Sequence, residues 1–158
     1  MKRIYMDNAA TTRVTEPVMQ VMLPYLTSVY GNPSSVHAFG RDARRALDAA
    51  RAQVAKALNA KPNEIYFTGC GTESDNWAIR GTAYARKDKG NHIITSAIEH
   101  HAVLHTCEQL EKEGFRVTYL PVDEEGLIRI EDLKAAITDT RMVSGVMASS
   151  SWAIEIRP

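Results

Sequence analysis

The chain has 158 residues, enough for about one domain, and its 19 basic and 19 acidic residues cancel to a formal net charge of zero. It has no dense basic run, which argues against a nucleic-acid partner, and no apolar stretch approaches the length that spans a bilayer. The two cysteines lack Cys-x-x-Cys spacing and the amino terminus lacks an apolar signal segment, so we expect a reduced, cytoplasmic protein without a disulfide framework or a membrane partner.

The first 60 residues predict two helices separated by an irregular loop. A helix is expected to begin near Thr15, and Pro24 should kink it or end it early. Residues 30–37 are rich in Gly, Pro, Asn and Ser, which is typical of a loop. Residues 41–59 show a helical apolar period, and their basic side chains lie mostly off the apolar face, as on a solvated surface.

A glycine turn follows an apolar segment at residues 65–68, which we expect to be a strand. The glycines let the backbone pass close to a ligand, and the first N–H groups of the next helix suit a phosphate, with the Thr72 hydroxyl as a further donor. The alternative is an ordinary strand-to-helix turn that binds nothing. A dinucleotide loop fits poorly because Ser74 stands where the third glycine belongs, and a flavodoxin-like phosphate loop normally follows the first strand of its domain.

Beyond this turn, helices and strands alternate with short connections. This order predicts an α/β fold with parallel strands, right-handed crossovers and ligands at the carboxyl ends of the strands. The glycine turn at residues 69–72 and His100 are both expected at that edge. The expected elements are a helix through 77–84, strands at 91–97, 115–121 and 141–148, a helix ending near 113 and a short helix at 131–137.

Three histidines beyond the glycine turn, and one cysteine within it, are further candidates for chemistry. The His100 imidazole could stack on an aromatic cofactor or shuttle a proton, or it could simply cap a helix at the surface. His101 and His105 are four residues apart, but no third ligand is evident, and we predict no metal site. Cys70 stands at a helix amino terminus without an evident histidine partner, so we assign it no catalytic role.

Four ordered segments carry a resemblance to a known family. They are DNAATT at 7–12, YGNPSSVH at 30–37, FTGCGTESDN at 67–76 and EHHAVL at 99–104. Together they resemble the cysteine desulfurases, pyridoxal-phosphate enzymes of the class V aminotransferase group that supply sulfur for iron–sulfur clusters. The resemblance runs nearly without gaps from about Tyr5 to Met147.

The resemblance implies part of a fold type I pyridoxal-phosphate transferase, with a mainly parallel sheet, flanking helices and an incomplete large domain. Residues 1–14 would lie near the substrate pocket, and residues 15–158 would form the first half of the cofactor-binding domain. Gly71 and Thr72 would hold the phosphate of pyridoxal 5′-phosphate. His100 would stack on the pyridine ring and act catalytically in proton transfers.

The same resemblance implies L-cysteine as the substrate, and either a second copy or a separate chain carrying the missing half as the partner. The family's Schiff-base lysine and persulfide cysteine would lie beyond Pro158, so we expect the chain alone to be inactive. An asparagine that touches the cofactor in the family is replaced by serine within residues 149–151. A non-catalytic interaction or scaffold subunit is the alternative, and another class V member, such as an aminotransferase or selenocysteine lyase, is a third.

Overall fold

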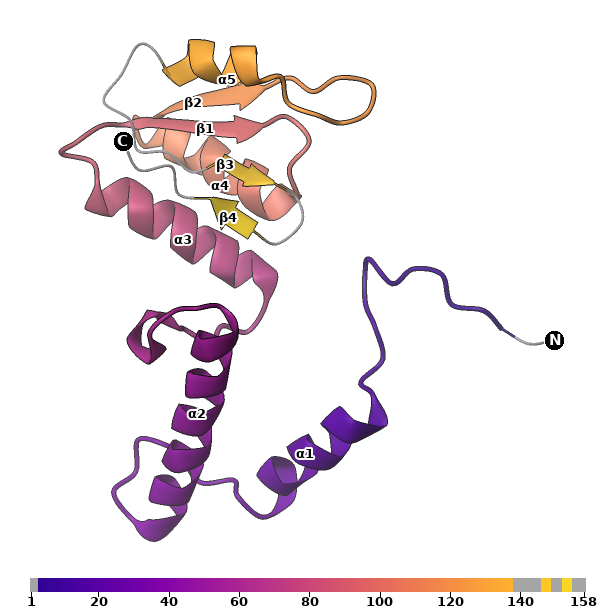
Figure 1. The fold of residues 1–158 in the computed structure, drawn as a ribbon. Coiled ribbons are helices and arrows are strands. Elements are labelled where there is room, and N and C mark those ends of the chain that lie inside the picture. Colours follow the sequence, from indigo (N-terminus) through magenta and orange to yellow (C-terminus); the bar gives the residue numbers. More distant parts are fainter. Residues whose placement is uncertain (1–2, 138–145, 149–151, 155–158) are drawn as a thin grey trace. The chain divides into compact units, whose positions relative to one another are not determined.

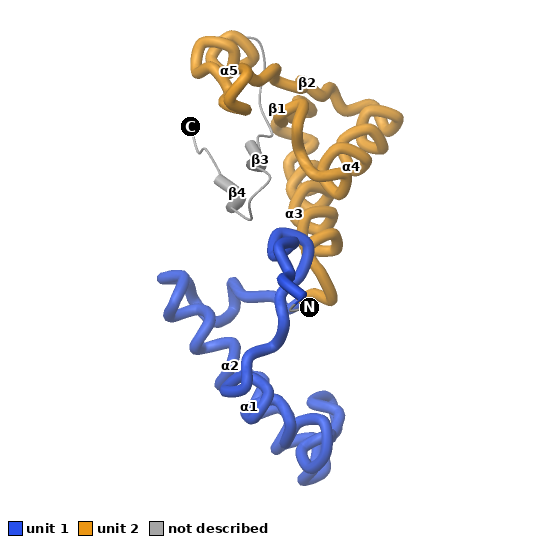
Figure 2. Tube along the Cα trace, turned by 90° about the vertical axis from the view of Figure 1, so that its right-hand side faces the viewer, with its two compact units in different colours: residues 1–67 blue, residues 68–158 orange. Residues whose placement is uncertain are grey.

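The computed structural model describes residues 3–137, 146–148 and 152–154. The chain divides into two compact units, Met1–Phe67 and Thr68–Pro158 (Figure 2). The division falls directly before the glycine turn, where the composition shows no linker. The division into residues 1–14 and 15–158 stays a prediction.

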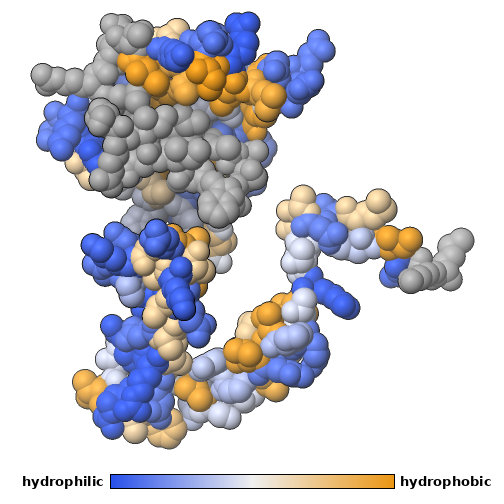
Figure 3. Space-filling view, in the orientation of Figure 1, coloured by the Kyte–Doolittle hydropathy of each residue, from blue (hydrophilic) through white to orange (hydrophobic). Residues whose placement is uncertain are grey.

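Unit 1 begins with helix α1 (Glu16–Thr27), whose N-cap is Thr15, as predicted. Pro24 lies inside the helix, which continues to Thr27, so the expectation that the proline would end it early is wrong. No residue of α1 is buried, and its apolar side chains lie on the surface of the unit (Figure 3). These exposed side chains are Val18, Met19, Val21, Met22, Leu23, Tyr25 and Leu26.

Helix α2 (Ala38–Ala57) begins three residues earlier than predicted because His37 caps it. The His37 Nδ1 atom accepts a hydrogen bond from the Gly40 N–H at 3.4 Å. Gly40 is buried against the preceding loop, where an added Cβ would lie 2.2 Å from the Ser35 carbonyl oxygen and 2.7 Å from that of Asn32. The loop and the first turn of α2 therefore pack backbone against backbone.

The predicted strand at residues 65–68 is wrong. After a short 3₁₀ helix, η1 (Pro62–Glu64), the backbone is extended at Ile65, but no strand is assigned there. The Arg51 Nε atom donates to the Ile65 carbonyl at 3.2 Å, and its guanidinium lies 5.3 Å from the centre of the Phe67 ring. Arg51 is therefore not on a solvated face: it holds this segment to α2.

Unit 2 contains a parallel pair of strands, β1 (His92–Ser96) and β2 (Arg116–Leu120), joined by helix α4 (His101–Lys112) (Figure 1). Helix α3 (Gly71–Ala85) packs on α4, and α5 (Ile130–Ile137) lies against β2. The predicted parallel strands and crossover helix are confirmed here.

A second pair of strands, β3 (Val146–Ala148) and β4 (Trp152–Ile154), is antiparallel, which the alternation of elements did not predict. The rest of the predicted strand at 141–148 and the serines at 149–151 lie outside the described residues. Within the described part of the chain, no helix combines the length and the apolar character needed to cross a membrane.

The core of unit 2 lies between α3, α4 and the β1–β2 pair. Strand β1 is buried along its whole length. Helix α4 ends at Lys112, close to the predicted end near 113, and Gly114 follows with φ of +92°. Burial raises the pKa of the Cys107 thiol to about 11, so this cysteine is an inert core residue. The core residues are Ala83, Ile93, Val103, Cys107, Leu110 and Phe115.

Candidate functional site

The glycine turn at the start of α3 is held by its own side chains. The Glu73 carboxylate accepts a hydrogen bond from the Gly69 N–H at 2.6 Å, and the Thr68 and Ser74 hydroxyl oxygens lie 2.5 Å apart. Cys70 is the N-cap but makes no side-chain capping bond. Since the first N–H groups of a helix have no partner within it, this end of α3 retains donors for a ligand.

Gly71 faces open space. A Cβ added there would meet no atom within 4 Å, so close packing within the protein does not require glycine at this position. Thr72 follows it in the first turn of α3, with an exposed side chain. The turn therefore has room for a bulky anion beside its donors, although the phosphate-binding role of both residues stays a prediction.

His100 is the N-cap of α4, and its Nδ1 atom accepts a hydrogen bond from the Ala102 N–H at 3.1 Å. The capping alternative considered from the sequence is thus confirmed. It does not exclude a binding role, because the imidazole remains exposed. With Nδ1 as acceptor, the neutral ring carries its proton on Nε2, and the ring orientation is fixed.

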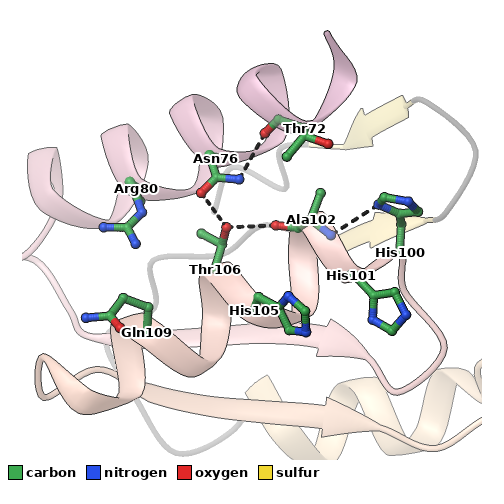
Figure 4. Close-up of a pocket in the computed structure, with 9 residues that line it drawn as sticks. All are labelled: Thr72, Asn76, Arg80, His100, His101, Ala102, His105, Thr106 and Gln109. Atoms are coloured by element: carbon green, nitrogen blue, oxygen red, sulfur yellow. Dashed lines mark hydrogen bonds between the residues drawn. The ribbon is translucent and has the colours of Figure 1, made fainter.

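Thr72 and His100 line the same groove between α3 and α4, with a volume of about 510 Å³ (Figure 4). The structure thus brings two of the three predicted site residues to one groove, while Gly71, which directly precedes Thr72, does not line it. Among the residues that the structure describes, none that lines the groove is acidic or a lysine. The lining residues are Thr72, Asn76, Arg80, His100, His101, Ala102, His105, Thr106 and Gln109.

Two residues that the sequence did not single out connect the helices across this groove. The Asn76 Nδ2 atom donates to the Thr72 carbonyl at 2.9 Å, and the Thr106 hydroxyl lies 2.7 Å from Asn76 Oδ1 (Figure 4). Thr106 is only 3% exposed. One sequence signal could have indicated Thr106: it is a hydroxyl residue next to Cys107, on the apolar, inward-facing side of the helix.

The other histidines of the groove contact each other. The rings of His101 and His105 stack with centroids 5.2 Å apart and planes at 23°. Among the residues that the structure describes, no group of three or more His, Cys, Asp or Glu side chains could hold a metal ion. Both histidines line the groove and form part of its wall.

Glu99 is a buried carboxyl directly before His100, and it is 5% exposed. Its Oε1 atom accepts a hydrogen bond from the Ser96 hydroxyl at 2.9 Å, while Oε2 has no hydrogen-bond partner among the described residues. Burial raises the pKa of this carboxyl, the Ser96 bond opposes that rise, and the Asp75 carboxylate adds to it. The sequence had marked Glu99 only as part of a motif.

Because the pKa of Glu99 is raised in the folded state, its contribution to the free energy of unfolding should fall as pH rises. Above the ordinary pKa of 4.5 the unfolded state ionises first, so unfolding becomes easier until pH passes the raised folded-state pKa. We expect Glu99→Gln, which keeps the Ser96 acceptor, to raise the thermal midpoint at pH 8 and to lose that advantage as pH falls below 4.5. Thermal unfolding across this pH range measures both effects.

Glu124→Gln is the matched control, because Glu124 is exposed in a turn. This variant should unfold like the unmodified protein at every pH. If Glu99→Gln is less stable than the unmodified protein at pH 8, ionisation of Glu99 does not destabilise the folded state and the prediction is wrong.

Comparisons with known proteins agree with the resemblance. The aminotransferase class-V family model matches residues 4–153. The chain is 55% identical over 157 residues to the cysteine desulfurase IscS of Clostridium botulinum, covering 99% of this chain and 40% of the relative. It is 50% identical over 158 residues to the putative cysteine desulfurase IscS 1 of Bacillus subtilis, covering 100% of this chain and 42% of the relative.

The solved structure of a NifS-like protein is also similar, with a TM-score of 0.87 and 41% sequence identity. That match covers 93% of this chain and 40% of the NifS-like chain. The chain thus spans about two-fifths of the length of the relatives it matches.

Proposed function

Since the chain belongs to the class-V aminotransferase family, we propose that it is part of a pyridoxal-phosphate-dependent cysteine desulfurase. Identities of 50 to 55% with proteins named as cysteine desulfurases support this class over other members of the family. Its part in the enzyme is to hold the cofactor phosphate at the start of α3 and to cover one face of the pyridine ring with His100. L-Cysteine is the proposed substrate, and L-alanine the product, of the whole enzyme.

One observation carries the proposal: Thr72 and His100 line one groove at the amino-terminal ends of two packed helices. Pyridoxal phosphate combines a doubly charged phosphate with a flat aromatic ring. The groove offers a helix N-terminus and a hydroxyl for the first and an exposed imidazole for the second. None of its lining residues in the described part of the chain is acidic, although the Glu73 carboxylate is bonded to the Gly69 N–H in the adjoining turn. The residues present therefore fit the cofactor.

The bound cofactor would supply an electron sink that weakens the bonds at the Cα atom of an amino acid. The residues of this chain would bind and orient it. Because His100 Nδ1 accepts the Ala102 N–H, Nε2 is the ring atom left to hold or exchange a proton in the groove.

A second candidate function is a non-catalytic interaction subunit derived from the same family. The observation that favours it is α1, where no residue is buried. An apolar helix surface of this kind is typical of a protein–protein contact. The two candidates differ in whether the chain takes up pyridoxal phosphate.

Replacing Thr72 by valine tests the phosphate role with little change of shape. We expect pyridoxal phosphate to bind saturably to the unmodified chain and about 10-fold more weakly to Thr72→Val, a loss of about 1.4 kcal/mol for one charge-assisted hydrogen bond. An absorbance or fluorescence titration at constant salt measures both constants.

Thr82→Val is the control, because Thr82 is exposed on the same helix but does not line the groove. It should bind the cofactor like the unmodified chain. Equal affinity of Thr72→Val and the unmodified chain would contradict the phosphate role. A folded chain that binds no pyridoxal phosphate would favour the interaction subunit.

A further inference from the structure

We infer that Asn76 and Thr106 are positioning residues that fix the phosphate-holding turn relative to the His100 ring. The inference rests on the proposed function, since it concerns how the two parts of the cofactor site are held together. Asn76 and Thr106 are not expected to touch the reacting atoms. They act through Thr72 and His100.

A continuous set of hydrogen bonds joins the two parts (Figure 4). The Thr72 carbonyl accepts from Asn76 Nδ2 at 2.9 Å, and the Thr106 hydroxyl lies 2.7 Å from Asn76 Oδ1. The same hydroxyl lies 2.7 Å from the Ala102 carbonyl, and the Ala102 N–H donates to His100 Nδ1 at 3.1 Å. The path therefore runs from the first turn of α3 to the cap of α4 without a gap.

The chemistry of each side chain fits this path in one orientation. An amide offers a donor on one side and an acceptor on the other, so Asn76 must point nitrogen at Thr72 and oxygen at Thr106. The Thr106 hydroxyl has one proton, which it shares between Asn76 Oδ1 and the Ala102 carbonyl. Thr106 is 3% exposed, so water cannot easily replace the bond.

The hydrogen bond between Asn76 and Thr106 depends on distance and angle, so it can fix the position of α3 along α4 in a way that apolar contacts cannot. The buried core around α3 and α4 also contains Ala83, Val103 and Cys107, whose apolar contacts are non-directional. The Asn76–Thr106 bond resists a slide of one helix along the other because its strength falls steeply with distance and angle. A slide would separate the phosphate donors from the ring that must cover the same cofactor.

The test compares Thr106→Val, which removes the hydroxyl at constant shape, with Thr106→Ser, which keeps it. In the full chain we expect Thr106→Val to bind pyridoxal phosphate about 10-fold more weakly, with altered circular dichroism of the bound cofactor at saturation. Thr106→Ser should restore the affinity to within about 3-fold, together with the circular dichroism. The circular dichroism matters because it reports ring orientation, which a loss of stability alone would not change.

Thr118→Val is the control for removing a half-buried threonine hydroxyl elsewhere in unit 2. Thr118 Oγ1 lies 2.7 Å from His92 Nε2, away from the groove. This variant should lose stability and keep the cofactor affinity and circular dichroism. Unchanged affinity and circular dichroism in Thr106→Val would overturn the inference.

A measurement without cofactor separates this inference from the proposed function. In NMR spectra of the ligand-free chain, Thr106→Val should shift both the Thr72 amide and the His100 ring signals, and Thr118→Val should shift neither. If the chain binds no pyridoxal phosphate but these shifts appear, the proposed function fails and the positioning role stands. If neither signal moves, the positioning role is overturned.

Should Thr106→Val fail to fold, Asn76→Asp provides the second variant. It keeps the acceptor for Thr106 but removes the donor to the Thr72 carbonyl. It should therefore move the Thr72 amide signal more than the His100 ring signals. An unmoved Thr72 signal would again overturn the inference.

Discussion

The 158-residue chain, prepared by itself with pyridoxal phosphate, is expected to release no alanine from L-cysteine. Catalysis by this cofactor on an amino acid depends on a lysine amine that bonds to it and exchanges with the substrate. No lysine lines the groove in the part of the chain that the structure describes. The resemblance to the desulfurases likewise matches none of the lysines present to the catalytic one.

Alanine is measured by chromatography after incubation, against a blank that contains cofactor and cysteine without protein. A full-length relative, such as the Clostridium botulinum desulfurase, is the positive control. Alanine or sulfide above the blank would contradict the expectation. Activity that appears only when a second, lysine-bearing polypeptide is added would support a shared active site over the interaction subunit.

Replacing Gly40 by alanine is expected to disrupt the first turn of α2 and the loop before it. The new Cβ would lie 2.2 Å from the Ser35 carbonyl oxygen and 2.7 Å from that of Asn32. Both are backbone atoms, so no side-chain rotation can relieve the overlap. We expect a loss of about 1–3 kcal/mol from local stability, as for other overpacked sites.

Amide hydrogen exchange measures this loss most directly, because the Ser35 N–H is bonded to the Asn32 carbonyl at 2.9 Å. The matched control is Gly81→Ala, in the interior of α3. There the added Cβ has its nearest contact at 3.7 Å from the Trp77 ring, and helix propensity should stabilise the variant by about 0.5–1 kcal/mol. Unchanged protection of Ser35 in Gly40→Ala would show that the loop is not built on this close approach.

The spacing of apolar residues and the positions of helix-ending residues predicted most elements of unit 2. The apolar period in α4, its end before Gly114, and the alternation of β1, α4 and β2 are all local signals in the chain. The resemblance, together with the position of the glycine turn and His100 after expected strands, placed the candidate site. The structure brings Thr72 and His100 to one groove, as that argument required.

What the sequence could not predict depends on contacts between distant residues. The segment at 65–68 has strand-like composition and an extended backbone at Ile65, but no strand pairs with it in the described part of the chain. The contact between Asn76 and Thr106 spans 30 positions and exists only because α3 packs on α4. The raised pKa of Glu99 likewise follows from burial that no local pattern announces.

The contrast between the two thiols has a practical consequence. With Cys107 sealed in the core and Cys70 exposed, a thiol-reactive fluorophore can be attached at a single native position, without removing any residue first. That position is the N-cap of α3, one residue before Gly71. A small dye there would report the binding of a ligand at the glycine turn, and a large dye would block that binding. The chain can therefore be labelled next to its candidate site without any substitution.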